Sequence, residues 1–301
     1  MDEVRFIGIG SGRSGTTWIV NILSEHPKIC CPLLGKLNYF ADTRPHNKTS
    51  EYNKRGIRGY LDLFKECGEG KIMGDFSSYY MVNPKVAEII KEHFPNVKIW
   101  ACLREPVERA YSDWLAFSNF KVKSKDDFEN AFFGEQDGLY PEGDGFRRRG
   151  FYYKQLKPYF DLFPRENIKI ILHEDILKNP GKVAKEFYEF LGVHSNYVPD
   201  NLNEKPAKAT QTKYKTLRQI INYLAGVSHK MEGSKIGGLI FLFKRKTKIS
   251  NLFNKINDLN VKDFEKPKLD SEIKKRLKKI YLEDLEKLEK LIGRDLSHWK
   301  N

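Results

Sequence analysis

Residues 4–26 constrain the fold more than any other part of the chain, because they combine a strand, a glycine loop and a helix. Residues 4–9 are short, apolar and rich in β-branched side chains, which predicts a buried strand. Residues 10–15 are too rich in glycine for a helix interior, and apolar residues then recur at helical spacing from Thr16. This order typically cradles a phosphate, because glycines let the backbone approach the anion and the helix N-terminus presents free N–H groups.

The loop differs from the P-loop of nucleotide hydrolases. A P-loop requires G-x-x-x-x-G-K-[ST], whereas residues 10–17 read G-x-x-x-x-G-T-T, with Thr16 in the place of the lysine. The cation has moved to Arg13, inside the loop. This difference argues against a standard magnesium-dependent nucleotide hydrolase.

A second anion site is predicted where another buried strand, residues 97–103, ends in Arg104. Ligands of open α/β sheets gather at the carboxyl ends of the strands. Ser112 lies about two turns into the helix expected from Pro106, so an arginine and a hydroxyl can hold one phosphate from two sides. Arg109 lies one turn before Ser112 and is either part of this site or a solvated helix charge.

Both stretches resemble motifs of the sulfotransferases that use 3′-phosphoadenosine 5′-phosphosulfate (PAPS). GSGRSGTTW is similar to the family's 5′-phosphosulfate loop, and Arg-x-Pro-x-x-Arg-x-x-Ser-x-Trp, at 104–114, is similar to its 3′-phosphate motif. The resemblance covers most of residues 4–200 and about 280–299. It implies a P-loop nucleotide-kinase-like fold and these PAPS-binding residues: Gly12, Arg13, Ser14, Gly15, Thr16, Thr17, Trp18, Arg104 and Ser112.

The resemblance is poor over residues 201–260, where the family has a basic loop that closes over the adenosine. Lys205, Lys208 and Lys213 are the candidates there, and Lys208 is the residue we assign. Each of them has a solvated surface lysine as its alternative.

The catalytic base is where the sequence departs from the family, whose carbohydrate-type branch places a glutamate before an aromatic pair. The matching stretch, residues 35–40, has Lys36 in that place and contains no acid. Asp75 follows a predicted strand and is the first candidate base, although it could instead cap the next turn. Lys36 is the second candidate, in a basic or electrostatic role, and Asp42 and His46 are weaker ones. Alternatively, the chain binds PAPS but transfers poorly for want of a base.

The alternation of strands and helices predicts an α/β fold with a central, mostly parallel sheet of about five strands flanked by helices. We expect a single domain over residues 1–301, with a helical C-terminal part from about residue 201 that carries the loops covering cofactor and acceptor. The apolar residues 236–243 are too few to span a bilayer. They are interpreted as a buried segment, an acceptor-facing lid or a membrane-surface contact near 235–246.

The cysteines and the N-terminus predict a reducing, cytoplasmic location. Cys30, Cys31, Cys67 and Cys102 resemble neither a disulfide framework nor a metal site, and we expect no metal. No signal peptide precedes the first strand, and the membrane anchor of the family's Golgi members is not present.

The predicted function is therefore transfer of a sulfuryl group from PAPS to a hydroxyl or amine of an acceptor, with adenosine 3′,5′-bisphosphate (PAP) as the leaving group. Arg13 would neutralise the charge that develops on that leaving group. The carbohydrate-type resemblance favours a carbohydrate or glycolipid acceptor. One alternative is a nucleoside or small-molecule kinase with a degenerate P-loop. Another is a non-enzymatic nucleic-acid or anion binder, suggested by the net charge of +13, although the basic residues are scattered and we expect no nucleic acid partner.

Overall fold

A computed structural model describes eight segments of the chain, and they belong to two compact units. The first unit comprises residues 1–207 and 268–301, and the second comprises residues 208–267. The single domain expected over 1–301 stays a prediction. The described residues are 4–32, 37–41, 50–117, 126–133, 145–203, 210–212, 261–263 and 267–300.

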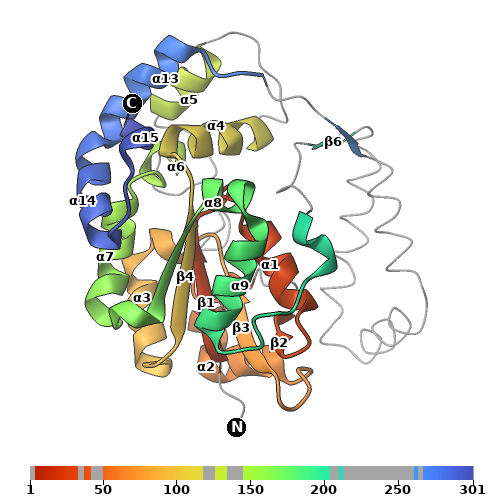
Figure 1. Cartoon of the computed structure of the whole chain (residues 1–301). Helices are drawn as coiled ribbons and strands as arrows, with labels where there is room; N and C mark the ends of the chain where they lie inside the picture. The colour runs from red at the N-terminus through yellow and green to blue at the C-terminus, as the bar shows by residue number, and fades with distance from the viewer. Residues whose placement is uncertain are drawn as a thin grey trace. The chain divides into compact units, whose positions relative to one another are not determined.

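The first unit contains a five-stranded parallel sheet of order β2-β3-β1-β4-β5 (Figure 1). The central strand β1 lies between β3 and β4, and nearly all of its residues are buried, as its apolar sequence predicts. This arrangement confirms the predicted α/β fold with about five parallel strands. The strands are β1 (Val4–Gly10), β2 (Ile29–Cys30), β3 (Ile72–Phe76), β4 (Lys98–Leu103) and β5 (Ile168–Leu172).

Helices cover both faces of this sheet (Figure 1). α1 (Thr16–Glu25) and α9 (Pro180–Leu191) share one hydrophobic cluster with Trp100 of β4. α3 (Pro84–His93) and α7 (Tyr152–Leu162) belong to a second cluster, which contains Ile99 of the same strand. Neighbouring strand residues therefore face opposite clusters, as the pleat requires.

The remaining elements of the first unit are short. The α-helices are α2 (Glu51–Leu61), α4 (Pro106–Phe117), α5 (Asp127–Phe133), α6 (Gly145–Arg148), α8 (His173–Lys178), α13 (Ser271–Lys278), α14 (Leu282–Ile292) and α15 (Ser297–Lys300). The 3₁₀ turns are η2 (Asp62–Phe64), η3 (Tyr80–Val82), η4 (Arg165–Asn167), η5 (Asp200–Asn203) and η6 (Lys279–Tyr281).

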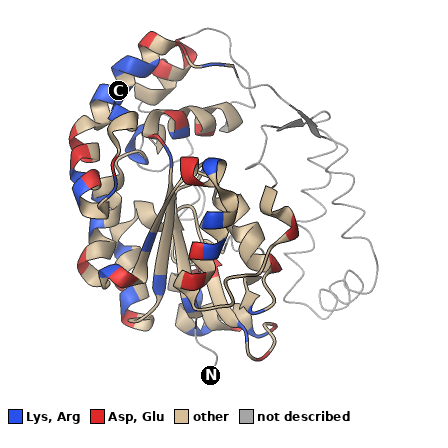
Figure 2. Ribbon diagram, viewed as in Figure 1, with Lys and Arg blue, Asp and Glu red and all other residues tan. Residues whose placement is uncertain are grey.

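The C-terminal helices complete the core on the α7 side. Leu285 and Leu288 of α14 are buried there, while acidic and basic side chains alternate along the outside of this helix (Figure 2). The Asp284 carboxylate accepts hydrogen bonds from the backbone N–H groups of Tyr153 (2.9 Å) and Lys154 (3.3 Å), at the start of α7. These contacts fasten α14 to the N-terminal turn of α7.

The second unit has two described strands, β6 (Thr210–Thr212) and β7 (Val261–Asp263), which pair antiparallel. The apolar residues 236–243 and the proposed membrane contact at 235–246 lie outside the described residues. Among the helices that the structure describes, none has the length and apolar character needed to cross a membrane.

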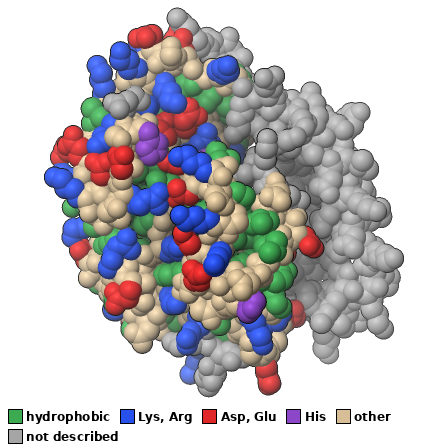
Figure 3. All heavy atoms as spheres, viewed as in Figure 1, with side chains coloured by type: hydrophobic (Ala, Val, Ile, Leu, Met, Phe, Trp, Pro, Cys, Tyr) green, Lys and Arg blue, Asp and Glu red, His purple; other side chains and the backbone are tan. Residues whose placement is uncertain are grey.

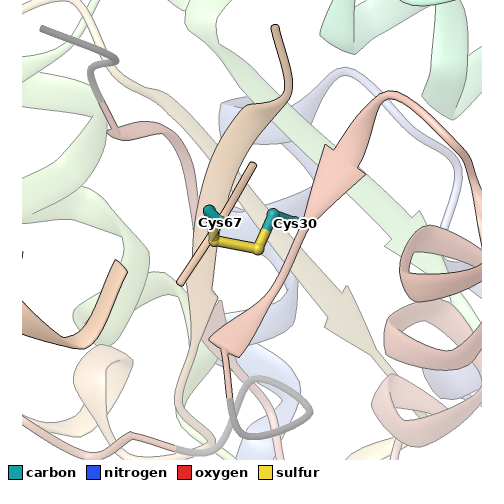
Figure 4. Close-up of a disulfide and its surroundings, with 2 residues drawn as sticks. All are labelled: Cys30 and Cys67. Carbon is teal, nitrogen blue, oxygen red and sulfur yellow. A yellow bond between two sulfur atoms is a disulfide. The ribbon is translucent and has the colours of Figure 1, made fainter. Parts of the chain in front are cut away.

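A disulfide between Cys30 and Cys67 corrects the expectation that the cysteines are unpaired (Figure 4). Cys30 lies on the short edge strand β2, and Cys67 lies in the turn after η2. The two Cα atoms are 5.8 Å apart, which suits a disulfide, although 37 positions separate the residues in sequence. Cys31 and Cys102 are free thiols.

Candidate active site

The candidate site lies at the carboxyl edge of the sheet, beside the central strand β1. The later strands of the chain lie on both sides of β1, with β2 and β3 on one side and β4 and β5 on the other. Open α/β sheets bind ligands at such a switch point. The glycine loop leaves β1 there, Ser77 follows β3, Arg104 follows β4 and His173 follows β5. Parallel pairing thus brings together segments that are far apart in sequence.

The glycine loop is fastened to β4 by hydrogen bonds of its own small side chains and backbone. The Ser11 backbone N–H and hydroxyl both donate to the Cys102 carbonyl, at 2.8 and 3.2 Å. The Ser11 and Ser14 hydroxyls are 2.7 Å apart, and the Cys102 thiol donates to the Ser14 carbonyl at 2.8 Å. Ser14 is fully buried, so its side chain holds the loop in shape.

Gly15 is required by its backbone conformation at the start of α1. Its φ is 95°, in the left-handed region, and an added Cβ would lie 2.9 Å from Nδ1 of His173. That nitrogen donates to the Ser14 carbonyl at 3.0 Å. Thr17 is exposed in the first turn of α1, whereas the side chain of Thr16 is buried. The helix N-terminus therefore presents backbone N–H groups and one free-standing hydroxyl at this edge.

Three arginines converge on the carboxylate of Asp113 in α4. Arg149 approaches it at 2.8 Å, Arg109 at 3.2 Å and Arg13 at 3.6 Å. The three guanidinium groups bring positive charge close to the loop, which suits an anionic ligand. Arg13 keeps 40% of its side chain exposed, so it can contact a ligand directly.

Arg149 is the residue that the sequence interpretation missed. Its Nη2 lies 2.7 Å from the position of a Cβ built on Gly12, its guanidinium stacks on the Tyr79 ring at 5.0 Å, and it approaches the Ser78 carbonyl at 3.4 Å. The side chain is therefore inserted beside the glycine loop. It is the third of three consecutive arginines at 147–149, and no local pattern singles it out.

Arg109 is buried, so its interpretation as a solvated helix charge is wrong. It has no exposed surface, and its Nη2 donates to the Phe146 carbonyl at 2.5 Å. Its Nε has no hydrogen-bond partner among the described residues. Arg109 thus joins α4 to α6 as the buried member of the arginine cluster.

Arg104 and Ser112 lie where the sequence predicted, after β4 and on α4. Arg104 Nη2 is 3.2 Å from Oε2 of Glu108, and the hydroxyl of Tyr152 donates to the Arg104 carbonyl at 2.8 Å. Glu108 is also held by Lys274, at 2.5 Å. Ser112 is 8% exposed. A phosphate bound by Arg104 would share this arginine with Glu108.

Asp75 lies in a buried cage of tyrosines. It is 1% exposed, and its Oδ2 accepts hydrogen bonds from the hydroxyls of Tyr80 (2.7 Å) and Tyr60 (3.4 Å). The Phe76 N–H also donates to the carboxylate, at 2.5 Å. Burial raises the pKa of Asp75 to about 7, although these three hydrogen bonds lower it. A carboxyl with this pKa suits general-base chemistry, but its route to an acceptor is enclosed.

Trp18 lies in the core between α1 and η5. It is 3% exposed, and its indole N–H donates to the Leu202 carbonyl at 3.2 Å. The ring is thus already enclosed by packing. Its assignment as a PAPS-binding residue stays a prediction.

The other candidate residues lie outside the described part of the chain. In the described ranges, no group of three or more His, Cys, Asp and Glu side chains could hold a metal ion. On the face of the molecule that Figure 3 shows, basic and acidic side chains are interspersed, without a continuous basic patch. The residues outside the description are Lys36, Asp42, His46, Lys205, Lys208 and Lys213.

Comparison with known proteins places this geometry in a context. A family model described as a sulfotransferase domain matches residues 5–290. A sulfotransferase structure from Alicyclobacillus acidocaldarius shares the fold, with a TM-score of 0.69 and 23% identity over 100% of both chains.

Two curated relatives are matched over only part of their length. The membrane-associated sulfotransferase kil1 of Dictyostelium discoideum is 22% identical over 75% of this chain and 64% of its own. Mouse heparan sulfate glucosamine 3-O-sulfotransferase 3A1 is 25% identical over 62% of this chain and 44% of its own. The chain thus matches less than two thirds of the length of the first protein and less than half of the second.

Proposed function

The chain belongs to the sulfotransferase domain family, and from this premise we propose that it transfers a sulfuryl group from PAPS to a hydroxyl or amine of an acceptor. The observation that carries the proposal is the glycine loop at the carboxyl end of β1, with Arg13 and Arg149 beside it. The loop offers backbone N–H groups and positive charge where the 5′-phosphosulfate would lie.

Arg104 and Ser112 are the proposed ligands of the 3′-phosphate. Both follow β4, the neighbour of β1, so one nucleotide could contact both segments. Lys208 stays a proposed contact to the adenosine. The residues proposed to hold the 5′ side are Gly12, Arg13, Ser14, Gly15, Thr16, Thr17 and Trp18.

Catalysis would rest on positioning and on charge stabilisation. Sulfuryl transfer should proceed in line through a loose transition state, as phosphoryl transfer does, with PAP as the leaving group. Arg13 and the N–H groups around Gly15 would stabilise the charge that develops on the leaving group. Because a sulfuryl group carries less charge than a phosphoryl group, we propose that transfer needs no bridging metal.

Asp75 stays the first candidate base and Lys36 the second. The pKa of about 7 supports Asp75 as a base. Its hydrogen bonds to Tyr60 and Tyr80 instead support a structural role, in which Asp75 positions the backbone next to it. Single-turnover transfer by Asp75→Asn and Lys36→Ala at equal PAPS occupancy separates these roles. A wild-type rate in Asp75→Asn would remove Asp75 as the base.

We propose a carbohydrate or glycolipid acceptor. The support is the similarity to a protein named as a heparan sulfate glucosamine 3-O-sulfotransferase, which this chain matches over less than half of that protein's length. A panel of acceptors with labelled PAPS, followed by mass spectrometry of the products, identifies the acceptor class.

A cytoplasmic location stays a proposal, and the Cys30–Cys67 disulfide argues against it, because disulfides persist mainly in oxidising compartments. Alkylation of the thiols in intact cells, followed by mass spectrometry, tests this point. Alkylated Cys30 and Cys67 would support the cytoplasm, and a disulfide-linked peptide pair would contradict it.

One calorimetric titration tests the proposed function. We expect tight binding of PAP in the absence of magnesium. Binding only of Mg-ATP would instead indicate a kinase, and binding only of an oligonucleotide would indicate a nucleic-acid binder. Labelled PAPS then tests transfer directly.

A further inference from the structure

Lys274, on the C-terminal helix α13, lies between two carboxylates at the start of α4. Its Nζ is 2.5 Å from Oε1 of Glu108 and 3.9 Å from Oε2 of Glu105. Lys274 and Glu108 are 166 positions apart in sequence, so this contact arises only through the fold. A C-terminal side chain therefore reaches the segment that begins with Arg104.

Helix α13 is fixed beside α4 by apolar packing (Figure 1). Ile273 and Leu277 of α13 are buried in the same hydrophobic cluster as Val107 and Ala110 of α4. Lys274 directly follows Ile273 in the sequence. The packing thus sets the position from which the lysine side chain reaches Glu108.

The backbone of Glu108 is fixed as well. The Glu105 carboxylate accepts hydrogen bonds from the backbone N–H groups of Val107 (2.8 Å) and Glu108 (3.0 Å), and so caps the first turn of α4. Glu108 is held within one turn of Arg104. Only the contacts of its carboxylate can vary.

That carboxylate is divided between two cations. Oε2 of Glu108 accepts a hydrogen bond from Nη2 of Arg104 at 3.2 Å, whereas Oε1 accepts one from Lys274 at 2.5 Å. An arginine and a carboxylate readily form two parallel hydrogen bonds when both oxygens are available. Because Lys274 holds one oxygen, Glu108 contacts Arg104 through the other.

Arg104 consequently keeps donors for a ligand. A guanidinium group has five N–H donors, and within the described residues the side chain of Arg104 makes this one hydrogen bond. The side chain is 21% exposed. The donors that Glu108 does not use can bind a phosphate, in competition with Glu108.

We propose that Lys274 is a positioning residue for the 3′-phosphate site. By holding Glu108, it keeps Arg104 available to the phosphate without contacting the phosphate itself. In its absence, Glu108 turns both oxygens toward Arg104 and competes for the same donors. This inference rests on the proposed function, because it requires Arg104 to bind the 3′-phosphate.

The test is calorimetric binding of PAP to the full chain. Lys274→Met removes the charge, and Lys275→Met is the matched control, because Lys275 lies next to it on α13, is exposed and forms no ion pair with the described residues. We expect about fivefold weaker binding for Lys274→Met and a change of less than about twofold for Lys275→Met. Equal PAP affinities of these two variants would overturn the proposal.

A second ligand separates positioning from a general loss of positive charge. Adenosine 5′-phosphosulfate lacks the 3′-phosphate, so Lys274→Met should change its affinity by less than about twofold. Unchanged binding of this ligand also shows that the variant is folded. An equal loss for PAP and adenosine 5′-phosphosulfate would overturn the proposal.

A second substitution separates positioning from direct contact. Glu108→Gln removes the charge that competes for Arg104, so adding Lys274→Met to Glu108→Gln should weaken PAP binding by less than about twofold. A loss of about fivefold that persists in the double variant would make Lys274 a direct ligand of the phosphate and overturn the proposal.

The same titrations distinguish this inference from the proposed function. If the wild type does not bind PAP, the proposed function fails and this inference fails with it. If the wild type binds PAP and Lys274→Met binds it equally well, this inference alone fails.

Discussion

The ends of β1 and β3 lie side by side in the sheet, but charged side chains are partly exposed at one and buried at the other. Beside the loop that follows β1, three arginines contact the carboxylate of Asp113, and one of them, Arg13, remains partly exposed. Near the end of β3, the single carboxylate of Asp75 is enclosed by hydroxyls and a backbone N–H. The first region thus keeps a partly exposed guanidinium that a ligand can reach, whereas the carboxylate of the second region is buried and hydrogen-bonded within the protein.

The largest expected effect concerns the enclosed carboxylate. Because the pKa of Asp75 is raised from 3.8 to about 7, the folded state keeps a proton there that the unfolded state has released. The free energy of unfolding of the wild type, relative to that of Asp75→Asn, should therefore fall by about 4 kcal/mol as the pH rises from below 3.8 to about 7. Urea unfolding at pH 4 to 8 measures this.

Asp161→Asn, on the exposed surface of α7, is the control for replacing an aspartate with asparagine. A constant stability difference between the wild type and Asp75→Asn across this pH range would show that the carboxyl of Asp75 is not held in its acid form.

The second effect concerns the two ends of the nucleotide. Arg104→Ala should weaken binding of PAP by about 1.5–3 kcal/mol, because a charge-assisted bond to the 3′-phosphate is lost. Adenosine 5′-phosphosulfate lacks that phosphate, so its binding should change little. Calorimetry with both ligands tests the assignment, and an equal loss for both ligands would refute it.

The third effect concerns the backbone of the loop. Gly15→Ala should lower stability by about 1–2 kcal/mol, because alanine is strained at φ 95°. Gly192→Ala is the matched control, since its φ is 76° and no atom lies within 4 Å of the added Cβ. Thermal unfolding compares their stabilities. Only Gly15→Ala should also weaken PAP binding, and unchanged binding in it would remove this end of the loop from the site.

The smallest effect concerns Arg149. Arg149→Gln should weaken PAP and adenosine 5′-phosphosulfate alike, by about 1 kcal/mol, because it acts on the 5′ side. Arg13 and Arg109 would still neutralise Asp113. A selective loss of PAP binding, measured by calorimetry, would instead assign Arg149 to the 3′-phosphate.

Local patterns predicted the parts of the fold and site that depend on neighbouring residues. The apolar run of β1, the glycines after it and Arg104 at the end of β4 all lie as expected. Asp75 was placed at the site because its strand ends there. However, the side chains of a strand alternate between two faces, and Asp75 points toward Tyr60 and Tyr80.

What the sequence did not reveal depends on pairing between distant segments. His173 reaches Ser14, and Arg149 reaches Gly12, only because β5, α4 and α6 are packed around the loop. The Cys30–Cys67 disulfide likewise depends on the pairing of β2 with β3. The spacing of residues in the sequence does not reveal which distant segments come into contact in the fold.

The sheet unit is discontinuous in sequence, and this affects how it is made. Residues 268–301 belong to it, Trp299 is 2% exposed and its indole N–H donates to Glu174 at 2.9 Å. During synthesis, the α7 side of the sheet therefore remains uncovered until α14 and Trp299 have left the ribosome. Nascent chains arrested before residue 268 should expose apolar surface and recruit chaperones, and release of the tail should end that exposure.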